Sequence, residues 1–278
     1  MSQTAQLTAD VCVTRMVISA AADRADQPAL IGAGARQETE TYSYRRFAAT
    51  VEAAASGLAR RGLQARDVVG ILVPDVVSFI LARHAVHAAG GVPTPVDPGL
   101  PPAEIAGQLA ESGARMLITA PPLAEAALAA ADRSWVRQVF SFADAPGTTR
   151  FSDLLGLDIV RPLGARPDDP ALMPFSRGPD GRLRPVPLSH AEACVYLRQL
   201  DQQASLADGE VLLATPPGGD GLAYTLLTDS AMLRGATVVA TCTAGLAAAA
   251  AEYHGTAAMV LPADVGIVPY GLRAIGIG

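Results

Sequence analysis

The chain of 278 residues contains no lysine and no asparagine, so every one of its 21 Lys+Arg cations is an arginine. A GC-rich genome accounts for much of this bias, because both missing residues use AT-rich codons. The absence still excludes, within this chain, any mechanism that needs a lysine ammonium, such as a Schiff base or a lysine-clamped phosphate. Only arginine remains as a permanent cation for binding an anion.

Cysteine, aromatic side chains and positive charge are also scarce. The three cysteines, Cys12, Cys194 and Cys242, are far apart and odd in number, which argues against a disulfide framework and for a reducing cytoplasm. The net charge of -6 gives little support to nucleic-acid binding, which needs clustered cations. Aromatic residues make up only 5%, so we expect a core of small and branched aliphatic side chains.

The sequence also lacks a long uninterrupted hydrophobic run. Its most apolar window, residues 68–92, is interrupted by Asp75, Arg83, His84 and His87. This window therefore does not predict a membrane span. The first residues, MSQTAQLTADVC, lack the basic region followed by an apolar region that is typical of a signal peptide. We expect a cytoplasmic protein with neither nucleic acid nor membrane as a partner.

The sequence is rich in short apolar runs that alternate with amphipathic stretches, the pattern of repeated βαβ units. Hydrophobic residues make up 50% and charged residues 17%, a globular composition. We predict an α/β fold with layered, mostly parallel sheets and flanking helices. The predicted strands are 67–74, 90–98, 115–120, 136–142, 210–217, 235–242, 256–263 and 271–278. The predicted helices are 42–63, 76–89, 101–113, 124–131 and 222–233, with another beginning at 189.

Changes in composition along the chain predict four segments. Residues 1–28 form a helical lead-in, and residues 29–143 form a first βαβ-type subdomain. Residues 144–169 are rich in proline, glycine and aspartate, which is typical of a surface connection. Residues 170–278 form a second α/β subdomain, which we expect to be incomplete at its C-terminus.

The stretch PFSRGPDGRLRPVPLSH, residues 174–190, has the outline of a phosphate-binding loop. Gly178 and Gly181 lie between turn-forming residues, and a helix is predicted to follow. Ser189 can accept a hydrogen bond from a backbone N–H while Glu192 reaches back, so the pair predicts a capping box at the start of that helix.

The ordered series of elements resembles the N-terminal part of the adenylate-forming superfamily, which includes acyl- and aryl-CoA ligases, luciferases and peptide-synthetase adenylation domains. No single piece is specific; the likeness lies in the series, which covers nearly everything from Ala29 to Gly278. The segments that carry it are TYSYRRF, ARDVVGILVPDVVSFI, GGVPTPVDPGLPPAEIAGQLAESGARMLIT, LSHAEACVYLRQL and LLATPPGGDGLAYTLLTDSAMLRGATVVA. The resemblance implies an ATP-dependent acid-CoA ligase that uses ATP and Mg²⁺ on a small carboxylic acid or acyl group.

The resemblance also assigns site residues. The cofactor-binding candidates in the loop are Ser176, Arg177, Gly178, Gly181 and Arg184. The resemblance implies no catalytic residue and no metal ligand within this chain.

The departures from the family pattern lie where the chemistry is expected. The family loop is rich in Ser, Thr and Gly and closes on a lysine, whereas Pro179 and Asp180 here replace hydroxyls and Arg184 takes the place of the lysine. Proline removes a backbone donor, and aspartate adds negative charge where phosphates would lie. Asp220 stands where the family usually has a histidine. Asp220 and Gly221 are candidate substrate-binding residues, although PPGGDG is also a good turn.

Two other pairs are weaker candidates. His190 and Cys194, four residues apart, would make a thiolate-imidazole pair, but no third orienting group is indicated, so a structural histidine and a buried cysteine are favoured. His84 and His87 would make a metal site, but no Cys or carboxylate partner accompanies them. For these two we expect a partly exposed helix face.

The resemblance implies that the adenine contacts, the magnesium-binding glutamate and a lysine-bearing C-terminal domain lie beyond the equivalent of Gly278. We therefore expect a truncated, degenerate relative, a pseudoenzyme that does not adenylate an acid on its own. One alternative is a non-catalytic assembly module, in which the strand at 271–278 pairs with a second copy or a partner protein. This strand can equally pair internally. A further alternative is a residual ligase that uses Arg184 and is completed in trans.

Overall fold

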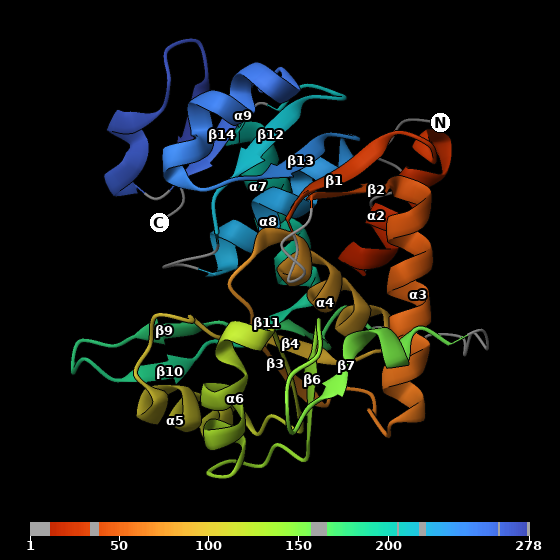
Figure 1. The fold of residues 1–278 in the computed structure, drawn as a ribbon, viewed down its shortest axis with the longest axis vertical. Helices are drawn as coiled ribbons and strands as arrows, with labels where there is room; N and C mark the ends of the chain where they lie inside the picture. Colours follow the sequence, from red (N-terminus) through yellow and green to blue (C-terminus); the bar gives the residue numbers. More distant parts are fainter. Residues whose placement is uncertain are drawn as a thin grey trace. The chain divides into compact units, whose positions relative to one another are not determined.

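A computed structural model describes residues 12–33, 39–156, 166–204, 206–216, 221–260 and 262–276 (Figure 1). The chain forms two compact units, and each is assembled from separate stretches of sequence. The first unit comprises Met1–Ala48, Asp75–Ile80 and Cys194–Gly278, and the second comprises Ala49–Pro74 and Leu81–Ala193. The division of the sequence into four consecutive segments follows the chain and stays a prediction.

The first unit is built on a six-stranded, mostly parallel sheet. Its strands are β1 (Pro28–Ala33), β2 (Thr39–Ser43), β12 (Val211–Ala214), β13 (Thr237–Ala240), β14 (Ala257–Val260) and β15 (Arg273–Gly276). The order is β15-β14-β12-β13-β1-β2, and every neighbouring pair is parallel except β1 and β2. Buried aliphatic residues fill β12 to β14, as is typical of parallel strands covered on both faces.

Helices cover this sheet. The helices that lie wholly in the first unit are α2 (Val13–Ala21), α8 (Gly221–Leu233) and α9 (Leu246–Tyr253). Three others, α3 (Tyr44–Arg60), α4 (Val76–Ala88) and α7 (His190–Ala204), contain the sequence boundaries between the units. At the start of α3 the buried Tyr44 hydroxyl lies 2.7 Å from the carbonyl oxygen of Ala236 and 3.1 Å from that of Met232, and burial raises its pKa.

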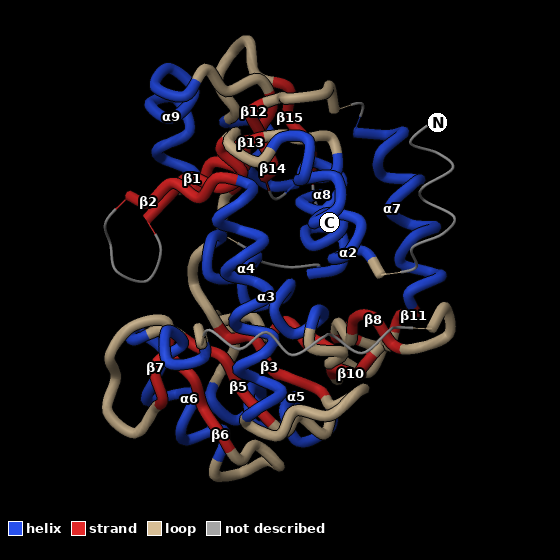
Figure 2. The backbone as a smooth tube through the Cα atoms, turned by 90° about the vertical axis from the view of Figure 1, so that its right-hand side faces the viewer, coloured by secondary structure: helices blue, strands red, loops and turns tan. Residues whose placement is uncertain are grey.

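The second unit is built on a five-stranded sheet. Its strands are β3 (Val68–Leu72), β4 (Val92–Pro95), β5 (Met116–Thr119), β6 (Gln138–Ser141) and β7 (Thr149–Arg150). The order is β4-β3-β5-β6-β7, and all pairs are parallel. Figure 2 shows helices flanking the strands of this unit. The predicted α/β fold with mostly parallel sheets is confirmed.

The helices of this unit begin and end where the sequence predicts. α5 (Pro102–Ser112) starts after Pro101 and ends at Gly113, whose φ of 68° is in the left-handed region that glycine tolerates. α6 (Ala124–Ala131) follows β5.

The short 3-10 helices of the described chain are η1 (Ala22–Arg24), η2 (Pro121–Leu123), η3 (Phe151–Leu154), η4 (Thr243–Gly245) and η5 (Pro262–Ile267). Among the helices built from described residues, none is long and apolar enough to cross a bilayer.

Two small antiparallel pairs complete the second unit: β8 (Pro170–Leu172) with β11 (Leu188–Ser189), and β9 (Phe175–Arg177) with β10 (Leu183–Pro185). The chain between them is anchored to β4, because Met173 N donates to Pro93 O at 3.0 Å and Thr94 Oγ1 donates to Met173 O at 2.7 Å. The β9–β10 hairpin lies beside α5 (Figure 1).

Candidate functional site: the hairpin at residues 175–185

The phosphate-loop candidate is the turn of the β9–β10 hairpin. Across the strands Arg184 pairs with Ser176, which is exposed. In the turn, Gly178 N donates to Arg182 O at 2.8 Å and Gly181 N donates to Gly178 O at 2.9 Å. Gly181 has a φ of 75°, which an L-residue with a side chain rarely adopts. The two glycines matched to the family loop therefore shape a tight, internally bonded turn.

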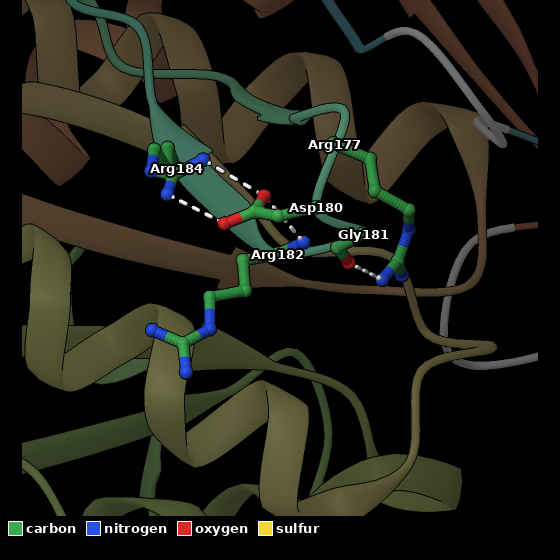
Figure 3. Close-up of polar contacts among 5 residues, drawn as sticks. All are labelled: Arg177, Asp180, Gly181, Arg182 and Arg184. Atoms are coloured by element: carbon green, nitrogen blue, oxygen red, sulfur yellow. Dashed lines mark hydrogen bonds and ion pairs between the residues drawn. The ribbon is translucent and has the colours of Figure 1, made fainter.

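The turn holds a two-pronged ion pair between Asp180 and Arg184. Arg184 Nη1 donates to Asp180 Oδ1 at 2.9 Å, and Nη2 donates to Oδ2 at 2.7 Å (Figure 3). The backbone N–H of Arg182 also donates to Asp180 Oδ1, at 3.2 Å. These contacts, with Arg184 the largest cause, hold the pKa of the Asp180 carboxyl below its usual range. The carboxylate is therefore charged at neutral pH and is bound by the arginine that replaces the family lysine.

Gly178 makes room for this ion pair. A Cβ on Gly178 would lie 2.5 Å from Arg184 Nη1 and 2.9 Å from Asp180 Oδ1. The ion pair thus lies directly against the backbone at Gly178. Glycine in a phosphate-binding loop lets a ligand approach the backbone closely. Here two side chains of the protein occupy that space.

The other arginines of the hairpin have different surroundings. Arg177 Nη1 donates to Gly181 O at 2.7 Å, and its Nη2 donates to Glu104 Oε2 on α5 at 3.0 Å. This pair joins the hairpin to α5. In Figure 3 the Arg182 side chain points away from the Asp180 carboxylate, and within the described part of the chain it makes no ion pair.

The hairpin leaves few groups for the phosphates of ATP. Pro179 has no N–H, and the N–H groups of Gly178, Gly181 and Arg182 donate to acceptors inside the turn. Arg177 and Arg184 are both paired with carboxylates. No group of three or more His, Cys, Asp or Glu side chains suited to a metal ion occurs among the described residues. With these donors and cations paired, the hairpin in this conformation does not fit a polyphosphate.

Of the two candidate substrate-binding residues, Asp220 lies outside the described residues. Gly221 begins α8, in the first unit, whereas the hairpin belongs to the second unit.

The histidines of α4 correct the expectation of a partly exposed helix face. His84 and His87 are both buried, at 0% and 7% exposure. His87 Nε2 donates to Ala171 O on β8, and burial, followed by the charge of Arg83, lowers the pKa of His87 to about 3. The ring centroid of His190 lies 5.8 Å from that of His87. Sequence reasoning missed this pair because about a hundred residues separate its members.

His190 and Cys194 show the features of the structural alternative. His190 is buried at the start of α7, and burial lowers its pKa. The Cys194 thiol is buried, and that burial raises its pKa, which opposes thiolate formation. The predicted capping box is confirmed: Ser189 N donates to Glu192 Oε2 at 2.8 Å, and Glu192 N donates to Ser189 Oγ at 3.2 Å.

Several solved structures share this fold. An apo structure of MbtA from Mycobacterium smegmatis superimposes with a TM-score of 0.84 at 24% identity, over 96% of this chain and 52% of that one. A long-chain-fatty-acid-CoA ligase (FadD1) from Archaeoglobus fulgidus superimposes with a TM-score of 0.82 at 20% identity, over 92% of this chain and 53% of that one.

The sequence comparisons identify relatives. A 4-coumarate--CoA ligase from Pinus taeda is 33% identical over 174 residues, which are 61% of this chain and 31% of the relative. A 4-coumarate--CoA ligase-like protein from Oryza sativa subsp. japonica is 30% identical over 236 residues, 76% of this chain and 39% of the relative. The chain thus spans less than half the length of these curated relatives. The family model described as AMP-binding enzyme matches residues 18–265, so the chain belongs to the AMP-binding enzyme family.

Proposed function

We propose that this chain is an acyl-CoA-ligase-like member of its family that does not adenylate a carboxylic acid on its own. The observation that supports the proposal is the closed hairpin. Its backbone donors face inward, and its lysine-replacing arginine is bound by Asp180.

The physical argument is electrostatic. Adenylation joins a carboxylate to the α-phosphate of ATP and releases pyrophosphate, so the site has to stabilise negative charge as it develops. Inward donors do not contribute to that stabilisation. A carboxylate at 180 also repels the polyphosphate, and this repulsion is strongest at low ionic strength.

The experiment is an ATP–pyrophosphate exchange assay with Mg²⁺ and a panel of carboxylic acids. The panel includes 4-coumarate and long-chain fatty acids, because the relatives and the structural neighbours are named for them. We expect no exchange above a blank without protein. The 4-coumarate--CoA ligase of Pinus taeda, run in parallel, is the positive control. Exchange by this chain at a rate comparable with that control would contradict the proposal.

A second candidate function is assembly with a second copy through the edge of the first unit's sheet. β15 lies at that edge and pairs only with β14 among the described strands. The segment before it exposes Ile267 at 57% and leaves Tyr270 fully exposed. Exposed apolar side chains beside an open edge favour pairing. Sedimentation velocity over a micromolar concentration series tests this function: we expect a dimer, and a well-folded monomer throughout would contradict it.

A further inference from the structure

The contacts of Asp180 are those that a bound oxyanion makes. Its two carboxylate oxygens accept from both Nη atoms of Arg184, at 2.9 and 2.7 Å, and one of them also accepts from a backbone N–H, that of Arg182. The planar guanidinium matches carboxylates and phosphates with the same two-pronged geometry. Gly178 supplies the close approach to the backbone. The turn therefore places a guanidinium and one backbone N–H around a carboxylate, the donor set that also suits a small oxyanion.

We propose that Asp180 is a built-in occupant of an oxyanion site formed by Arg184, the Arg182 N–H and the bare backbone at Gly178, and that this carboxylate excludes phosphoryl groups from it. The inference rests on the proposed function, since it names the residue that keeps the hairpin closed. Once Asp180 is removed, the site accepts a small phosphoryl oxyanion such as pyrophosphate.

The chain geometry explains why the internal carboxylate wins over a free anion. Asp180 and Arg184 are four residues apart on one tight turn, so the carboxylate has a high effective concentration at the guanidinium. A phosphate in solution has to displace it and approach a like charge at the same time.

The charges around the turn support the same inference. The hairpin carries three arginines, Arg177, Arg182 and Arg184, and the carboxylates that face them are Asp180 in the turn and Glu104 on α5. Removing Asp180 leaves three cations against one carboxylate. Because Arg177 stays paired with Glu104, Arg184 is the cation that becomes available, beside Arg182, whose side chain makes no ion pair within the described part of the chain.

The experiment measures the binding of inorganic pyrophosphate by isothermal titration calorimetry in the full chain, at low ionic strength and again at about 0.15 M salt. Asp180→Ala is expected to bind about tenfold more tightly than the unaltered chain, because a charge-assisted two-pronged contact replaces a repulsion. The gain shrinks at the higher salt concentration.

The matched control is Asp26→Ala. Asp26 is an exposed carboxylate in the first unit that pairs with Arg45, so its removal changes the net charge equally and also frees an arginine. This control is expected to bind pyrophosphate no better than the unaltered chain. The double variant Asp180→Ala/Arg184→Gln is expected to lose the gain.

A second substitution at the same position separates the loss of charge from a change in the shape of the turn. Asp180→Asn keeps an acceptor for the Arg182 N–H but removes the charge, so it is expected to show part of the gain. Circular dichroism and thermal unfolding check that each variant is folded. The inference is overturned if folded Asp180→Ala and Asp180→Asn bind no more tightly than Asp26→Ala, or if the gain survives the loss of Arg184.

The two proposals fail separately. Pyrophosphate exchange by the unaltered chain contradicts the proposed function, whatever the Asp180 variants do. Equal pyrophosphate affinity of the Asp180 variants and the Asp26 control contradicts this inference, even when the unaltered chain is inactive.

Discussion

The hairpin at 175–185 and the buried histidine pair, His87 with His190, lie in the same compact unit and use polar groups in opposite ways. In the hairpin, Asp180 and Arg184 are charged and about half exposed, at 45% and 53% of their side chains. In the interior, burial lowers the pKa of both histidines, which keeps them neutral. Substitution of an exposed charge changes the free energy of unfolding little, whereas substitution of a buried polar group lowers it.

An exposed turn can change its side chains without loss of the fold, whereas a buried polar pair cannot. A surface turn whose hydrogen bonds are internal keeps its shape without a ligand, so its side chains can be substituted without unfolding the protein. The backbone path of the hairpin is held by β4 through Met173 and by α5 through Arg177, and neither contact depends on a bound phosphate.

The largest expected effect contrasts two glycines, one from each kind of region. A Cβ on Gly57 in α3 would lie 2.6 Å from Leu154 Cα and closer still to its carbonyl oxygen, so backbone has to move. We expect Gly57→Ala to lower the free energy of unfolding by about 3 kcal/mol. For Gly178→Ala the neighbours are the ends of flexible side chains, and we expect a change within about 0.5 kcal/mol. Urea denaturation measures both changes. Equal losses would show that Gly178 is packed as tightly as Gly57.

The second prediction concerns pH. A folded-state pKa lowered to about 3 for His87, against about 6.5 unfolded, means that the neutral form is favoured in the fold. The contribution of neutral His87 to the free energy of unfolding is present above pH 6.5 and is lost as the pH falls toward 3. Between pH 7.5 and 5 we expect the free energy of unfolding to fall by about 2 kcal/mol from His87. His190 contributes in the same direction.

The measurement is the urea midpoint across that pH range, with His87→Leu as the comparison variant. The titratable groups that lower the pKa of His87 are Arg83 and His84 on its own helix and His190 on α7. Asp169, before β8, raises the pKa of His190 in turn. The variant is expected to show a flatter profile. An unchanged slope would show that His87 is not the titrating group.

The third prediction concerns the capping box, which lies at the start of α7 after the hairpin. Ser189→Ala removes the acceptor for the Glu192 N–H and is expected to cost about 1 kcal/mol of unfolding free energy. Ser189→Thr keeps the acceptor and is the control. If both substitutions have the same effect, the loss does not come from the cap.

The elements that the sequence predicted are those marked by neighbouring residues. Short apolar runs predicted β3, β4, β5, β6, β12, β13, β14 and β15, and prolines and Gly113 predicted the ends of α5. The β1–β2 pair and α9 were not predicted. β1 pairs with β13, about two hundred residues away, and the alanine-rich α9 has little polar contrast to mark a face. Pairing between strands far apart in the sequence leaves no pattern in the residues around either strand.

The site shows the same limit. The sequence predicted a turn at Gly178 and Gly181, which the structure contains. The loss of phosphate binding, expected from the negative charge of Asp180, stays a prediction. The structure adds what the spacing alone did not show: the carboxylate turns inward and binds Arg184. Likewise, nothing in the local pattern of α4 indicates that β8 buries His87. In both places a side chain's partner, rather than its position in an element, decides its role.

The smallest expected effect is the stability of the Asp180 variants. Because the ion pair is exposed and its contacts stay within five residues of turn, we expect Asp180→Asn to leave the urea midpoint unchanged at neutral pH. Below the ordinary carboxyl range, protonation of Asp180 removes the same pair, since its lowered pKa makes the contribution present only above that range. A shift of the midpoint as large as that of Ser189→Ala would mean that the closed turn supports the fold. The hairpin would then resemble the buried histidine pair, and closure of the anion site would be a requirement of folding instead of a change confined to the surface.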